Sequence, residues 1–140
     1  MATTQNSPLL ALPTELRLQI YAGILDSQEL IKFPSSPEDH EPTSLLQTCS
    51  QLRHEVNAEY YTWLKIQYTK VEVILKEAEK DLAVARSRIT RSGLQRPCFH
   101  RISDSNALNA HNTMLVYGDV QHEITKLMQR CLVRSPELKA

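Results

Sequence analysis

Apolar residues recur at helical spacing near the start of the chain. Leu16, Ile20 and Leu25, with Ile24 beside the last, are separated by four or five positions. This spacing places the apolar side chains on one side of a helix. Pro13 suits the first helical turn, because the backbone N–H that proline lacks has no partner there. The pattern predicts an amphipathic helix over residues 13–26.

A second apolar pattern begins near residue 45 and continues through several tens of positions. Thr43 or Ser44 can cap a helix here, and the apolar residues that follow keep helical spacing: Leu45, Leu46, Cys49, Leu52 and Val56. From Tyr61 a heptad repeat takes over. One seam position holds Tyr61, Tyr68, Leu75, Leu82 and Ile89, and the other holds Leu64, Val71, Ala78 and Ala85. The pattern predicts a long helix that ends near Thr90.

Small side chains in this seam indicate what packs against it. Ala78 and Ala85 let a neighbouring helix approach closely, and they weaken a parallel dimer, which prefers bulky residues. Gly93 and Pro97 interrupt the chain, and a third apolar pattern then follows, with Leu108, Leu115, Val120, Ile124, Leu127 and Cys131. We expect this last helix to bend or restart at Gly118. The sequence therefore predicts an antiparallel helical hairpin.

These elements divide the chain into two predicted domains of all-α class. Residues 9–64 would form a small helical bundle, and residues 65–135 would form the long helix and the hairpin. An insertion over residues 26–42 interrupts the bundle. It contains three prolines, three serines and several acidic residues, a composition that breaks helices and favours a solvated loop.

Composition agrees with a folded helical protein. The chain has 140 residues and a mass of 16.0 kDa, which gives room for one ordinary domain or for a small bundle and a hairpin. Hydrophobic residues make up 41% and charged residues 23%, so a core can form. Only three glycines are present, which leaves few positions for tight β-turns.

Charge and cysteine content indicate the cellular location and the kinds of partner to expect. Basic and acidic residues both number 16, so no net charge draws the chain to nucleic acid or to an anionic membrane. The three cysteines lie far apart and do not form the framework of a secreted disulfide-rich protein. No apolar run approaches the ~20 residues of a membrane span. We expect a protein of the cytoplasm, the nucleus or both.

The two best-patterned stretches carry a resemblance to a known family. Residues 9–21 read LLALPTELRLQIY, residues 44–55 read SLLQTCSQLRHE, and the aromatic pair Tyr60 and Tyr61 follows. In this order they resemble the F-box-like domains abundant in filamentous fungi, which open with LP-x-ELR-x-x-IY and continue with LL-x-x-C-x-Q-(L/I)-R-x-E. The resemblance covers residues 9–64. The insertion over residues 26–42 separates the motifs more widely than in a minimal F-box.

The resemblance implies a compact bundle that binds another protein. Authentic F-box proteins dock on the Skp1 adaptor of an SCF-type ubiquitin ligase, and by similarity the adaptor-facing positions are Leu12, Pro13, Leu16, Ile20 and Leu25. The alternative is that the apolar residues of both motifs form the core of a monomeric bundle. Trp63 lies among the aromatic residues where bundle and long helix meet, and we expect it to be a contact hot spot or a hinge.

Two other kinds of function stay open. One is a homodimer or larger assembly along the seam of the long helix, using Tyr68, Val71, Leu75, Leu82 and Ile89. The other is a small enzyme with a pocket between bundle and hairpin. No phosphate loop, nucleophile elbow or His-Glu-x-x-His pattern supports an enzyme, and the Cys and His spacings do not suit zinc. We expect a non-enzymatic protein-protein interaction module that needs no cofactor or metal.

Overall fold

The computed structural model describes residues 8–27, 43–47, 49–92 and 105–139. The helices are α1 (Thr14–Asp26), α2 (Thr43–Leu46), α3 (Ser50–Ser92) and α4 (Ser105–Arg134), and a short 3-10 helix, η2 (Pro136–Lys139), ends the described chain. No strand occurs in these ranges. The predicted all-α class is confirmed. The predicted insertion lies outside the described residues from position 28 onward.

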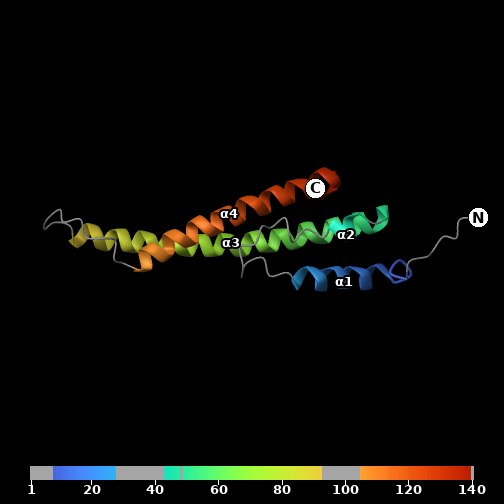
Figure 1. The fold of residues 1–140 in the computed structure, drawn as a ribbon, viewed down its shortest axis with the longest axis horizontal. Coiled ribbons are helices and arrows are strands. Elements are labelled where there is room, and N and C mark those ends of the chain that lie inside the picture. The colour runs from blue at the N-terminus through green and yellow to red at the C-terminus, as the bar shows by residue number, and fades with distance from the viewer. Residues whose placement is uncertain (1–7, 28–42, 48, 93–104, 140) are drawn as a thin grey trace, which may run out of the picture.

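The 43-residue helix α3 is the element along which the others pack. Figure 1 shows α4 running back along α3 in the opposite direction and α1 lying beside the N-terminal part of α3. The predicted hairpin of a long helix and a returning helix is therefore present. Residue 64, where the two predicted domains meet, lies inside α3, and the main core continues across it.

The main core forms where the apolar faces of α3 and α4 meet, and Leu25 of α1 joins it. Its buried members are Leu25, Tyr60, Trp63, Leu64, Val71, Val120, Ile124, Leu127 and Cys131. Leu64 and Val71 occupy one of the predicted seam positions, and Ala78 and Ala85 continue it as buried residues toward the far end of the hairpin. Sequence periodicity thus identified the face of α3 that α4 covers.

A second, smaller core joins α1 and α2 to the start of α3. Tyr21, Leu46, Leu52 and Val56 are its buried members. Partly buried leucines from the lead-in segment and from the two short helices pack against it: Leu9, Leu10, Leu18 and Leu45. Both motifs of the family resemblance contribute to this cluster, so the motifs meet in space although residues 26–42 separate them in sequence.

The prediction of one uninterrupted helix from residue 43 or 44 is wrong. Helix α2 ends at Leu46, α3 begins at Ser50, and Cys49 between them is exposed. The Arg53 side chain makes this break possible, because its Nε donates a hydrogen bond to the Leu46 carbonyl oxygen at 2.8 Å. A carbonyl in the last helical turn, which lacks a helical partner, is satisfied in this way.

The helix does not restart at Gly118, since α4 runs unbroken through it. A glycine inside a helix costs about 1 kcal/mol relative to alanine. Val120 and Ile124 follow it by two and six positions and are 6% and 0% exposed. Burial of each such side chain contributes about 1.5–3 kcal/mol, so the packing of α4 on α3 outweighs the local preference.

Asn57 attaches the C-terminal end of α4 to α3. Its Nδ2 donates hydrogen bonds to the Cys131 carbonyl oxygen at 2.9 Å and to Ser135 Oγ at 3.0 Å. Asn57 is fully buried, and Ser135 is 4% exposed. A buried amide needs such partners, because leaving it unbonded costs free energy. These hydrogen bonds fix the C-terminal end of α4 to α3.

Candidate partner-binding surface

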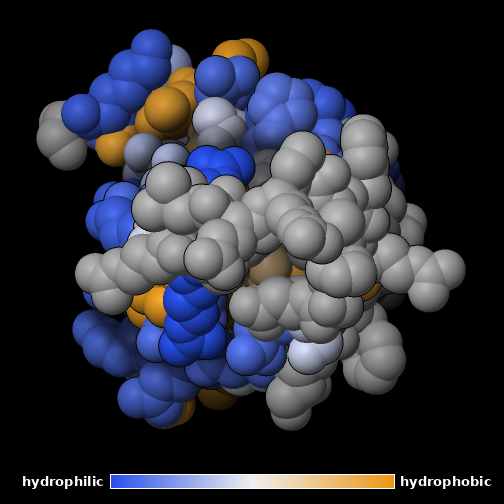
Figure 2. All heavy atoms as spheres, turned by 90° about the vertical axis from the view of Figure 1, so that its left-hand side faces the viewer, coloured by the Kyte–Doolittle hydropathy of each residue, from blue (hydrophilic) through white to orange (hydrophobic). Residues whose placement is uncertain are grey.

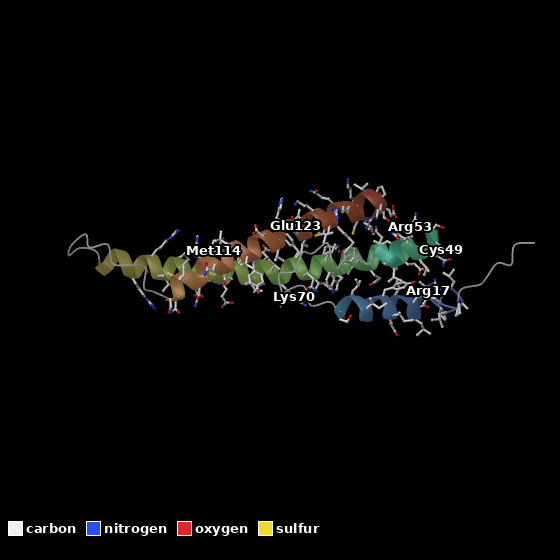
Figure 3. The ribbon with its side chains drawn as sticks, in the orientation of Figure 1. Arg17, Cys49, Arg53, Lys70, Met114 and Glu123 are labelled. Atoms are coloured by element: carbon white, nitrogen blue, oxygen red, sulfur yellow. The ribbon has the colours of Figure 1, made fainter. Side chains whose placement is uncertain are left out.

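An ion pair between the two sequence motifs sets the orientation of α1. Arg17 of the first motif donates to Glu55 of the second from Nε to Oε2 at 2.9 Å and from Nη2 to Oε1 at 2.6 Å. The side chains are only 4% and 13% exposed. Two parallel hydrogen bonds of this kind fix both distance and angle. Figure 3 shows Arg17 between α1 and α3.

Tyr21 adds a third hydrogen bond to this polar contact between α1 and α3. Its hydroxyl donates to Glu55 Oε2 at 3.3 Å. The hydrogen bonds from Arg17 are the main reason that the pKa of Glu55 lies below its usual value, and Tyr21 adds to this. Burial, followed by the nearby Glu55 charge, raises the pKa of Tyr21. The carboxylate is thus held ionised by its partners.

Arg17 also holds the segment that leads into α1. Its Nη1 donates to the carbonyl oxygens of Leu10 and Leu12, and its Nη2 donates to Thr14 Oγ1 at 3.0 Å. The guanidinium therefore satisfies the backbone of the lead-in turn as well as Glu55. Five rigid donors in one plane make arginine suited to this role, which lysine could not fill.

The consequence is that α1 turns three large apolar side chains to the surface. Arg17, Tyr21 and Leu25 face the interior, and Leu16, Ile20 and Ile24 are 46%, 40% and 39% exposed. These last three lie four residues apart and form one stripe along the helix. We call Leu16, Ile20 and Ile24 the α1 face. Ile24 was not among the predicted contact residues, although its spacing from Ile20 was the available signal.

Other apolar side chains also reach the surface, and Figure 2 shows hydrophobic residues between hydrophilic ones at the end of the molecule that it views. Examples are Leu115 and Val133 on α4, which are 57% and 81% exposed. Single exposed apolar residues are ordinary in folded proteins. A row of three on one helix is less so, because together they form a continuous surface.

The remaining predicted contact residues fall in different places. Leu12 is partly buried, and Pro13 is exposed at the position that caps α1. Leu25 and Trp63 are 2% and 5% exposed, so their assignment to a contact surface is corrected. Both belong to the main core, and the Trp63 ring stacks on Tyr60 with ring centroids 6.0 Å apart.

The predicted self-association seam is likewise covered within the chain. Val71 is completely buried, and Tyr68 and Leu75 are partly buried against the core that α3 shares with α4. Leu82 is partly buried as well. Ile89 is in α3, and its side chain lies outside what the structure describes. Because α4 occupies this side of α3, the seam does not offer a free surface to a second chain.

The described residues contain no group of three or more His, Cys, Asp or Glu side chains placed to hold a metal ion. None of the described helices combines the length and the apolar character that crossing a membrane requires. Comparison of the chain with protein-family models, curated proteins and solved structures found no match.

Proposed function

We propose that this chain is an F-box-like protein-protein interaction module that binds a partner through the α1 face. The partner we propose is a Skp1-type adaptor, which would make the chain a component of a ubiquitin ligase in the cytoplasm or nucleus. Binding of this kind needs no cofactor, metal or catalytic group. The observation that carries the proposal is the outward position of Leu16, Ile20 and Ile24.

The energetics of α1 support this proposal. An amphipathic helix in a monomeric bundle normally turns its aliphatic side chains inward. Here the ion pair of Arg17 with Glu55 takes the inward position together with Tyr21, and the aliphatic residues remain in contact with water. Exposed apolar area costs about 25 cal/mol per Å². A partner that covers the α1 face would recover that free energy.

The family resemblance supports the same division of roles. Within the first motif, the arginine and tyrosine positions, Arg17 and Tyr21, bond to Glu55 of the second motif. Two positions matched by similarity to adaptor contacts, Leu16 and Ile20, are exposed. Arg17, Tyr21 and Glu55 therefore fix the orientation of α1, and Leu16 and Ile20 remain available for a groove on a partner.

A pull-down with a purified Skp1-type adaptor tests the proposal. We expect wild type to retain the adaptor and Leu16→Asp plus Ile20→Asp to lose at least about tenfold in affinity, because two charges would be placed in an apolar contact. The control is Leu115→Asp plus Val133→Asp, which alters more exposed apolar residues of α4 and should bind like wild type.

Circular dichroism and thermal unfolding must show that all variants keep the fold. If folded wild type fails to bind the adaptor, ligase membership is refuted. If the α1 variant and the α4 variant bind equally well, the α1 face is not the contact surface.

A further inference from the structure

A second exposed apolar surface lies on α3, beyond the end of α1. Its most exposed apolar residues are Ile66 and Val73, which are 50% and 58% exposed. With Thr69, Lys70 and Ile74 they line an open hollow of about 590 Å³. We call Ile66, Lys70, Val73, Ile74 and Glu77 the α3 stripe.

The α3 stripe continues the side of α3 on which α1 packs. Leu52, Glu55 and Val56 meet α1, and steps of three or four residues along the helix lead from them to Ile66, Lys70 and Val73. Figure 3 shows Lys70 on the side of α3 that carries α1, past the end of that helix. Ile74 and Glu77 also border the hollow between α3 and α4, so the stripe extends from the α1 side of α3 to the edge of the side that α4 covers.

Charges on the stripe indicate what could cover it. Lys70 and Glu77 lie one heptad apart, about 10.5 Å along the axis, and Val73 and Ile74 lie midway between them. Neither charge forms an ion pair with another described residue. If two copies of α3 cross antiparallel with residues 73 and 74 at the two-fold axis, Lys70 of each copy faces Glu77 of the other, twice per dimer.

We propose that the α3 stripe is the self-association surface of this protein and that its occupant is the α3 stripe of a second copy. In the antiparallel register, Val73 of one copy packs between Lys70, Val73, Ile74 and Glu77 of the other, as a knob enters a hole. The apolar centre would be buried and flanked by opposite charges on both sides.

Two further features favour a second copy as the occupant. The net charge of the chain is zero, so no overall repulsion opposes association of two copies. Helix α1 ends where the stripe begins, so in the antiparallel pair an α1 helix stands at each end of the contact. The two α1 helices restrict the contact between the copies to the part of α3 that lies beyond the end of α1.

Sedimentation equilibrium of the full chain tests this surface and its register. We expect concentration-dependent dimers for wild type and at least about tenfold weaker association for Lys70→Glu or Glu77→Lys, since each change creates two like-charge contacts. The double variant Lys70→Glu plus Glu77→Lys restores opposite charges across the axis. Its association should return to within about threefold of wild type.

The outcomes separate this inference from the adaptor proposal. Leu16→Asp plus Ile20→Asp alters only the α1 face and should leave the dimer intact. A wild type that stays monomeric at hundreds of micromolar overturns the inference, as would occur if another segment or another protein covers the stripe. It is equally overturned if the double variant associates no better than the single variants, because the register would then be wrong.

Discussion

Arg17 and Glu55 determine which side of α1 meets water. The bidentate pair, with the Tyr21 hydroxyl added, places one polar edge of the helix against α3. The aliphatic residues that periodicity assigns to a single face are therefore divided, and Leu25 enters the core while Leu16 and Ile20 do not. Sequence alone could not predict this, because patterning rules treat charged residues as exposed and the partners lie 38 positions apart.

We predict that Glu55→Gln destabilises the fold at neutral pH. The change removes the charge from a nearly buried pair and leaves Arg17 without its counterion. The control is Glu72→Gln, which breaks the ion pair of Glu72 with Lys76, whose side chains are 43% and 65% exposed. Exposed pairs contribute little. Urea unfolding at pH 7 should therefore show a clear loss for the first variant and almost none for the second.

The effect of Glu55→Gln should depend on pH. The pKa of Glu55 is lower in the folded chain than its ordinary value of 4.5, mainly because of the hydrogen bonds from Arg17. The stabilisation is therefore complete above pH 4.5 and is lost as the pH falls through the lower, folded pKa. The difference in free energy of unfolding between wild type and variant should narrow at acid pH. An equal difference at pH 7 and pH 3 would contradict this account.

Among the elements, the pairing of α3 with α4 was the most predictable. Heptad periodicity identified the buried positions Leu64, Val71, Ala78 and Ala85, because a regular repeat over several turns has one consistent solution. Local interruptions were less predictable. At the break between α2 and α3, the Arg53 side chain donates a hydrogen bond to the Leu46 carbonyl oxygen, seven positions earlier. The helix propensities of single residues do not predict such a hydrogen bond.

We predict that enlarging the small seam residues weakens the hairpin. Ala78 and Ala85 are 6% and 3% exposed, and Ala110 of α4 is 6% exposed. Leucine at either position would force the helices apart, at a cost of about 1–3 kcal/mol. Ala83→Leu, on the exposed side of α3, is the control. Urea unfolding that gives equal stability for Ala78→Leu and Ala83→Leu would contradict close packing of these helices.

The whole molecule has one long helix covered on one side by α4 and on another side, over its first part, by α1. Among the described residues, the apolar surfaces outside the hairpin core include the α1 face and the α3 stripe. The sequence predicted the helices and the hairpin, and it predicted Leu16 and Ile20 as contact residues. It did not predict the α3 stripe, since the charges of Lys70 and Glu77 interrupt its apolar pattern.

We propose that the α1 face is the surface on which a partner docks. A nitrogen-15 NMR titration of the labelled chain with a purified Skp1-type adaptor tests it most directly. We predict shifts or broadening of backbone amides in α1, centred on Leu16, Ile20 and Ile24, with the amides around Leu115 and Val116 of α4 unchanged. Spectra that stay the same, or changes confined to α4, would contradict the claim.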